Sequence, residues 1–286
     1  MLWSRTKQCT TQALECGALL SLPTESEIVR QDGIDFLVRK LANLARKEAR
    51  QRSVPRLDNP FLPYEQDLYV GDVSDTHVCL LNKFNVVDHH LLVVTRAFEE
   101  QESPLNQRDF EALGYGLSEY ACLVFYNAGQ AAGASQRHKH LQIVPLPLAS
   151  QAPRIPLEAR LLEDARRGRY SLPFEYRFVR FPSGDSAPEI AAKAFGCYRN
   201  LLRELDLFRD SESVTDPSLA RTHPYNLLIT RDWLLMVPRV RENAAEIPVN
   251  ALGYAGTMLV KNANQLEILK QTGPLSLLGQ VARPIA

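Results

Sequence analysis

The stretch GASQRHKHLQ at residues 133–142 decides the fold and the chemistry of this chain. Alternate side chains of an extended strand point to the same face. His138, His140 and Gln142 are therefore expected to line one wall, with apolar residues packed behind them. Two of the six histidines of the chain lie in this stretch. Two imidazoles and a neutral amide on one wall, next to a loop of small residues, are suited to the transfer of a phosphorus-containing group.

Composition limits the partners of the chain. Its 286 residues can form one large domain or two smaller ones, and 33 basic residues balance 33 acidic ones. Binding to nucleic acid or to an anionic membrane is therefore not expected. No apolar stretch approaches the ~18 residues of a membrane helix, and the first residues lack the hydrophobic segment of a secretory signal. Five scattered cysteines without a CxxC pair predict reduced thiols in a cytoplasmic protein and no zinc site. A monomer or a weak homo-oligomer is expected.

The first half of the chain is predicted to contain helices and strands in separate groups. Residues 24–51 are expected to be helical, because Thr24 and Glu27 have capping-box spacing and apolar residues recur at roughly helical intervals. Gly33 interrupts this pattern, so two helices fit it as well as one. Strands are predicted at 67–70, 77–82, 89–95 and 122–126, with a helix that begins at Ser103-Pro104.

The second half begins with a change of composition. Residues 150–188 are rich in proline and arginine and are expected to form an irregular connection or insertion. The pattern then predicts a helix at 188–207, a hairpin of strands 225–230 and 233–237, and a helix at 263–271 that Gly273-Pro274 ends. Because strands come in neighbouring groups, an α+β fold with an antiparallel or mixed sheet is predicted.

The histidine strand has the residues of a covalent nucleotidyl carrier. An imidazole that attacks phosphorus needs its far nitrogen free and its near nitrogen held by an acceptor. His140 is the candidate nucleophile, and His138 could orient it or contact a phosphate. An amide at position 142 donates to a phosphoryl oxygen but can neither protonate a leaving group nor activate water. A third histidine there would suit a hydrolase, whereas Gln142 suits transfer to an incoming anion.

The loop before the histidines can supply the phosphate contacts. Glycines and alanines at 128–134 allow backbone N–H groups to approach a phosphate, and Asn127, Ser135 and Gln136 add neutral donors. Lys83 is a candidate cation for a polyphosphate, although a solvated strand end explains it equally well. The histidines could instead form a metal site, which lacks suitably spaced further ligands, or be partly buried polar residues without a role. His89-His90 is interpreted as a structural strand end.

These residues resemble the histidine-triad (HIT-like) superfamily and, more narrowly, its ATP adenylyltransferase (diadenosine tetraphosphate phosphorylase) branch. The resemblance lies in residues 80–84, 101–105, 125–142, 225–239 and 252–256. It implies a HIT-like antiparallel sheet flanked by helices. It also implies three parts: a catalytic HIT-like part at 1–150 with the HxHxQ motif, an irregular connection at 151–187, and a C-terminal ATP adenylyltransferase part at 188–286. This last part would complete the same sheet and nucleotide site.

The activity implied by the resemblance is reversible phosphorolysis of diadenosine tetraphosphate with phosphate to ATP and ADP, through AMP on a histidine. The implied catalytic residues are His140, His138 and Gln142. A divalent cation, commonly Mg²⁺, would be bound through the substrate polyphosphate and not by protein ligands. The implied substrate-binding residues are Lys47 (with Lys40 as a competitor), Asn82, Lys83, Asn127, Gly133, Ala134, Ser135, Gln136, Gln142, Asn226, Met236 and Arg239.

Three alternatives remain open on the sequence. One is a HIT-type nucleotidyl hydrolase. The second is a hexose-1-phosphate uridylyltransferase-like enzyme, whose usual proline between the histidines is replaced here by Lys139. The third is a nucleotide-binding sensor without catalytic activity. Arg137 also departs from the acidic residue that relatives often have before the histidine pair.

Overall fold

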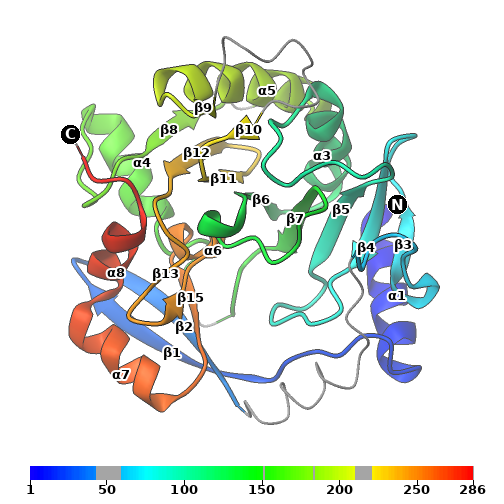
Figure 1. Cartoon of the computed structure of the whole chain (residues 1–286), viewed down its shortest axis with the longest axis horizontal. Coiled ribbons are helices and arrows are strands. Elements are labelled where there is room, and N and C mark those ends of the chain that lie inside the picture. The colour runs from blue at the N-terminus through cyan, green and yellow to red at the C-terminus, as the bar shows by residue number, and fades with distance from the viewer. Residues whose placement is uncertain (43–58, 151, 183, 210–220, 286) are drawn as a thin grey trace.

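An eight-stranded antiparallel sheet organises the protein (Figure 1). The computed structural model describes residues 1–42, 59–150, 152–182, 184–209 and 221–285. The strand order in the sheet is β3-β4-β5-β7-β6-β11-β12-β8, and every neighbouring pair is antiparallel. The strands are β3 Tyr69–Asp72, β4 His77–Leu81, β5 Leu91–Thr95, β6 Cys122–Ala128, β7 His140–Pro145, β8 Arg177–Arg180, β11 Tyr225–Ile229 and β12 Trp233–Pro238.

Helices cover one face of this sheet. They are α1 Leu2–Glu15, α3 Gln107–Glu119 and α5 Ala187–Glu204, and α3 lies beside α5 (Figure 1). Their apolar sides pack on Leu141 and Ile143 of the histidine strand and on Leu227 of β11. The apolar half of the histidine strand is therefore buried, as its alternation predicted.

The second face is covered only in part. A three-stranded sheet and four helices pack over strands β6, β11 and β12 through Phe125, Leu228 and Leu235. These elements are β1 Thr24–Gln31, β2 Ile34–Leu41, β15 Thr257–Val260, α4 Glu158–Arg167, α6 Ala251–Tyr254, α7 Ala263–Thr272 and α8 Pro274–Val281. Over β4 and β5 the same face carries a smaller apolar cluster around Phe61. The polar half of β7 lies between these two clusters.

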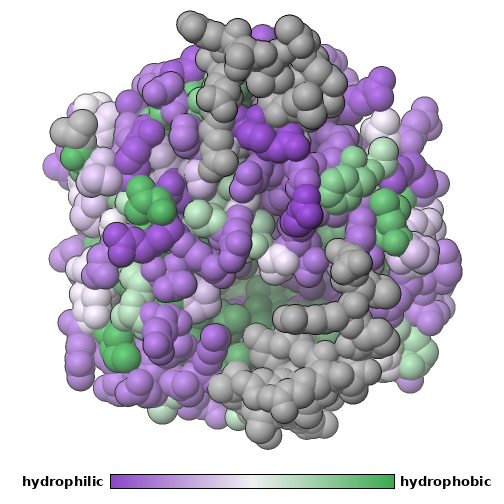
Figure 2. Space-filling view, viewed as in Figure 1, coloured by the Kyte–Doolittle hydropathy of each residue, from purple (hydrophilic) through white to green (hydrophobic). Residues whose placement is uncertain are grey.

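Short elements complete the chain. They are the 3₁₀ turns η1 Gln66–Leu68 and η2 Gln130–Ala132, and the two-residue strands β9 Phe208–Arg209, β10 Arg221–Thr222, β13 Asn243–Ala244 and β14 Ile247–Pro248. On the surface shown in Figure 2, polar side chains predominate and apolar ones occur in small groups. Among the described residues, no helix is long and apolar enough to cross a membrane.

The α+β fold class and its antiparallel sheet are confirmed, but the helix expected at 24–51 is wrong. Residues 24–41 form the hairpin β1–β2, in which Gln31 pairs with Ile34. Asp32 and Gly33 make its two-residue turn with φ values of 50° and 77°. Positive φ at both central turn residues matches the twist of a hairpin, and Asp-Gly is a favoured pair for it.

Two further expectations need correction. The connection at 151–187 is not irregular throughout, because it contains helix α4 and the edge strand β8. Gly168 in the left-handed conformation ends α4. Helix α3 does not begin at Ser103-Pro104 but after Asn106, whose side chain caps the helix together with Asp109. The hairpin of strands predicted at 225–230 and 233–237 and the helix ended at Gly273 are confirmed.

Candidate functional site

His140 is held in the tautomer that a nucleophile needs. Its Nδ1 lies 2.8 Å from the backbone oxygen of His138. A carbonyl only accepts, so Nδ1 carries the proton and Nε2 keeps its lone pair. No described residue bonds to Nε2. Burial lowers the pKa of His140 from 6.5 to about 4, against the raising effect of the carbonyl contact. The imidazole is therefore neutral near pH 7.

His138 fixes the backbone that holds His140. Its Nε2 lies 2.8 Å from the backbone oxygen of Thr95, and its Nδ1 lies 3.1 Å from the side-chain nitrogen of Asn59. Nε2–H therefore donates and Nδ1 accepts, which occupies both ring nitrogens. The ring of Phe61 lies 5.3 Å from the ring of His140 and 5.8 Å from that of His138. His138 thus positions the nucleophile through its own carbonyl.

Gln142 follows on the same face and is held by the residue that directly precedes the neighbouring strand β5. Its Oε1 lies 2.9 Å from Nε2 of His90, and Nδ1 of His90 lies 3.1 Å from Nδ2 of Asn82. The interpretation of His90 as a structural strand end is wrong, because its ring contacts a candidate catalytic side chain. Asn82 reaches the site through this ring.

Gln101 braces the site from behind. Its Nε2 donates to the backbone oxygens of Asn127 and His140 at 2.9 and 3.1 Å. Its Oε1 accepts from the backbone N–H of His140 at 2.9 Å. This one amide therefore ties the end of β6 to the start of β7. It lies within the 101–105 stretch of the resemblance, but the sequence offered no sign of this contact.

The small-residue loop has a geometry that requires glycine. Gly133 has a φ of 92°, and a Cβ there would lie 2.7 Å from the backbone oxygen of Val249. The N–H groups of Gly133 and Ala134 are used inside the turn. Those of Ser135 and Gln136 donate to no described residue, so they remain available to a ligand. The loop borders a cavity of about 630 Å³.

A second chain of polar side chains supports this loop from the C-terminal half. Arg239 donates to Oδ1 of Asn226 at 2.5 Å, and Nδ2 of Asn226 donates to Oδ1 of Asn127 and to the oxygen of Ala132, both at 2.8 Å. Oδ1 of Asn127 also accepts from the N–H of Ala251. Nδ2 of Asn127 is left without a partner among the described residues. Asn226 and Arg239 therefore support the loop through their hydrogen bonds to Asn127 and Ala132.

Other predicted residues lie elsewhere. Met236 does not join the site, because it is fully buried among the residues covered by helices on the opposite face. Alternation of side chains with a period of two places Met236 and Asn226 on opposite faces of the sheet. Lys83 pairs with Glu65 at 2.7 Å, and Lys40 pairs with Glu25 at 2.7 Å. Lys47 lies outside the described residues.

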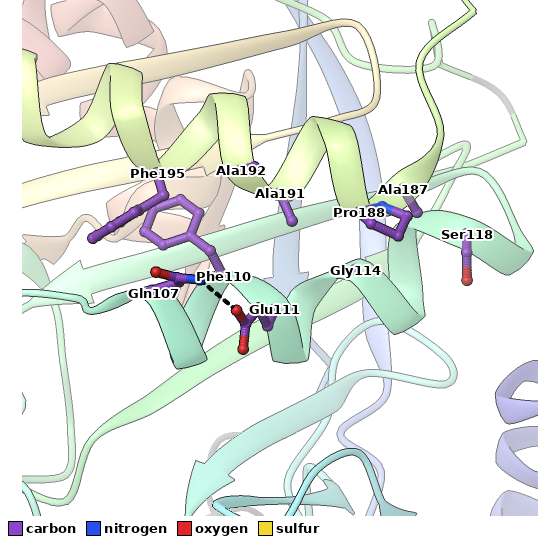
Figure 3. A pocket seen from close by; sticks show the side chains of 10 residues that line it. All are labelled: Gln107, Phe110, Glu111, Gly114, Ser118, Ala187, Pro188, Ala191, Ala192 and Phe195. Carbon is purple, nitrogen blue, oxygen red and sulfur yellow. Dashed lines mark hydrogen bonds between the residues drawn. The ribbon is translucent and has the colours of Figure 1, made fainter.

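A cavity of about 570 Å³ between α3 and α5 is separate from this site (Figure 3). Phe110 and Phe195 lie at one end of it, and it is lined mainly by apolar and small side chains. Both helices cover the face of the sheet away from His140. The described residues contain no group of three or more histidine, cysteine or acidic side chains able to hold a metal ion.

Comparisons with known proteins agree with this geometry. A family described as the Ap4A phosphorylase N-terminal domain matches residues 1–163, and one described as the ATP adenylyltransferase C-terminal domain matches residues 170–284. Diadenosine 5',5'''-P1,P4-tetraphosphate phosphorylase 2 of Saccharomyces cerevisiae is 30% identical over 251 residues, covering 78% of this chain and 75% of that protein. Protein APA1 of the same yeast is 28% identical over 282 residues, covering 87% and 84%.

Solved structures show the same relationship. The crystal structure of the yeast Ap4A phosphorylase Apa2 in complex with AMP matches with a TM-score of 0.76 and 26% identity, covering 99% of this chain and 97% of that one. The Apa2 complex with Ap4A has the same fold, with a TM-score of 0.74, 23% identity and coverage of 99% and 97%. The chain is a nucleotidyltransferase by fold and site. It belongs to the Ap4A phosphorylase family of ATP adenylyltransferases.

Proposed function

We propose that this protein catalyses the reversible phosphorolysis of diadenosine tetraphosphate to ATP and ADP, with AMP carried on His140. The observation that carries the proposal is the state of that imidazole: neutral, with Nδ1–H bound to a carbonyl and Nε2 without a described partner. Family membership gives the substrate class, and the side chains give the roles.

In the first step, Nε2 of His140 attacks the α-phosphorus. The bond from that phosphorus to its bridging oxygen breaks, and ATP leaves with the bonding electrons. The ring becomes cationic as the P–N bond forms, and the carbonyl of His138, 2.8 Å from Nδ1, stabilises the N–H that now carries part of the charge. A polyphosphate is a good leaving group, so the step needs no general acid.

In the second step, inorganic phosphate displaces the histidine. Its oxygen attacks the same phosphorus, the P–N bond breaks, and ADP forms while His140 recovers its lone pair. We expect the amide of Gln142 and the N–H groups of Ser135 and Gln136 to donate to non-bridging oxygens in both steps. Two in-line displacements retain configuration at phosphorus.

The hydrolase and uridylyltransferase alternatives are not favoured. Both domains of the chain match the Ap4A phosphorylase and ATP adenylyltransferase families. Gln142 also has no ionisable group with which to activate water, and its amide oxygen is already engaged by His90.

The remaining assignments follow from the substrate. We expect Mg²⁺ to arrive with the polyphosphate, which has the oxygen ligands that this cation prefers. Chelation with EDTA should then raise the KM for the dinucleotide. Small nucleotides and phosphate are the expected partners. The five cysteines are unpaired, which fits the proposed cytoplasmic location.

The proposal is tested by following the nucleotide. Diadenosine tetraphosphate is mixed with the protein in phosphate-free buffer, and mass spectrometry measures AMP bound to His140. Addition of phosphate should release ADP equal in amount to the ATP already formed. His140→Ala should give neither product. Production of AMP as the main species with or without phosphate would overturn phosphorolysis in favour of hydrolysis.

A further inference from the structure

A line of three side chains runs from a backbone N–H to the candidate catalytic amide. The N–H of Phe84 donates to Oδ1 of Asn82 at 3.3 Å. Nδ2 of Asn82 lies 3.1 Å from Nδ1 of His90, and Nε2 of His90 lies 2.9 Å from Oε1 of Gln142. The N–H of Asn82 also donates to the backbone oxygen of His90 at 2.9 Å, which keeps the two residues in register.

The direction of every bond in this line is set by its first member. A backbone N–H can only donate, so the atom of Asn82 that faces Phe84 is the oxygen and the atom that faces His90 is the NH₂ group. Nδ1 of His90 must then accept, and the ring proton lies on Nε2. That N–H requires an acceptor on Gln142. The oxygen of the Gln142 amide is therefore held toward His90, and its NH₂ group has no partner among the described residues.

Burial makes the direction matter. His90 is 6% exposed and Gln142 9% exposed, so water does not freely replace these bonds. Burial lowers the pKa of His90 from 6.5 to about 4, although its bond to Gln142 raises it. The ring is thus neutral near pH 7, with one donor and one acceptor. A Gln142 amide turned by 180° would meet the His90 N–H with its own NH₂ group, which is repulsive.

We propose that His90 and Asn82 are positioning residues that keep the NH₂ group of Gln142 turned toward the reacting phosphorus. This inference rests on the proposed phosphorolysis and adds to it the residues that orient the amide. If the amide were free to turn, its oxygen would face the phosphoryl oxygens for part of the time and oppose the negative charge that develops there. Asn82, which the resemblance gives as a nucleotide contact, acts through His90 instead.

A matched pair of substitutions separates orientation from simple packing. His90→Gln keeps an NH₂ donor near the place of Nε2, whereas His90→Asn keeps a polar group near Nδ1 and loses the donor to Gln142. Both replacements are uncharged amides. We expect His90→Asn to lower kcat by about 10- to 100-fold with little change in KM, and His90→Gln to recover most of that loss. Gln142→Ala should lower kcat by about 100-fold.

The decisive measurement is a double-mutant cycle on kcat. Because His90 acts only through the amide, His90→Asn combined with Gln142→Ala should be no slower than Gln142→Ala alone. Multiplied losses in the double variant would overturn the proposal, as would equal losses in His90→Asn and His90→Gln. If His90→Asn does not fold, Asn82→Ala enters the same cycle, and its loss must likewise vanish when Gln142 is absent.

Controls keep this result separate from the proposed function. His89→Asn changes the neighbouring histidine, which has a φ of 58° that asparagine tolerates and bonds to Thr10 away from the site, so its kcat should equal that of the wild type. Wild-type protein must form ATP and ADP in equal amounts. If it does not, phosphorolysis fails. If it does and the losses multiply, only the positioning role fails.

Discussion

The buried state of His140 predicts an acid sensitivity of the fold that one substitution should reduce. The pKa of its imidazole is 6.5 in an unfolded chain and about 4 in the folded protein, because burial penalises the charged form. Well above pH 6.5 the ring is neutral in both states and the full stability is present. As the pH falls from 6.5 toward 4, the imidazole of His140 binds a proton in the unfolded chain but not in the folded protein. Stability is lost over that interval.

The expected loss follows from linkage. Over the whole interval the shift of His140 is equivalent to about 3 kcal/mol, of which about 2 kcal/mol is lost between pH 7.5 and pH 5.0. Carboxylates also titrate in this range, but they are common to the wild type and a His140 variant. His140→Asn, which has no ionisable group, should therefore lose about 2 kcal/mol less than the wild type between the two pH values, although its stability at pH 7.5 is lower.

Urea unfolding at pH 7.5 and pH 5.0 measures this difference directly. The free energy of unfolding is extrapolated to zero denaturant for both proteins at each pH, with the m values checked for two-state behaviour. His90 has a similar shift to about 4, so His90→Asn should show a comparable reduction of pH dependence. Equal losses in the wild type and His140→Asn would refute the reasoning, because they would mean that the folded protein accepts the proton without penalty.

Three other substitutions test neighbouring parts of the site. Lys139→Met removes the cation whose nitrogen lies 3.4 Å from the buried carboxylate of Asp109. Thermal and urea unfolding should show a loss of stability of about 3 kcal/mol, which Asp109→Asn should partly reverse. An unchanged stability would contradict this expectation. Gly133→Ala places a Cβ 2.7 Å from the backbone oxygen of Val249 at a φ of 92°. This change should lower the free energy of unfolding by more than about 1 kcal/mol and raise the KM for the dinucleotide. Wild-type kinetics in this variant would show that the turn adapts. Gln142→His introduces a base able to activate water, so chromatography of products in phosphate-free buffer should show more AMP than the wild type releases; no increase would contradict the role given to the amide.

The fold is predictable where local pattern and tertiary packing agree. Buried strands appear in the sequence as apolar runs, so the strands at 77–81, 91–95 and 122–128 are predicted to within two residues. The 24–41 hairpin is not, because capping-box spacing at Thr24 competes with the turn signal of Asp32-Gly33. The Asp32-Gly33 pair is the stronger local signal, because these two residues adopt the positive φ values that a two-residue hairpin turn needs.

The site is predictable only along its own strand. Alternation places His140 and Gln142 together, because that relation depends on a period of two and on nothing outside the strand. Their partners come from distant positions: 52 residues separate His90 from Gln142, and 39 separate Gln101 from His140. No spacing rule connects such pairs before the strand order is known. The sequence therefore relates His90 to its neighbour along the chain, not to its neighbour in the sheet.

The charges around the cavity beside the small-residue loop bear on the proposed divalent cation, although neither His140 nor Gln142 is among the residues that line this cavity. Three carboxylates and two guanidinium groups line it among the described residues: Glu100, Glu102, Glu242, Arg137 and Arg221. Arg137 is already paired with Glu100. Acidic side chains therefore outnumber basic ones around this cavity, and this lining would compensate the negative charge of a polyphosphate without a bound cation only poorly. Under the proposed mechanism, a divalent cation bound to the polyphosphate would reduce this repulsion. The amides of the loop and of Gln142 would stabilise charge at the reacting phosphorus without holding the anionic products as strongly as a cluster of cations would. Neutral donors on the protein and a cation carried by the substrate would together suit a reaction that must run in both directions.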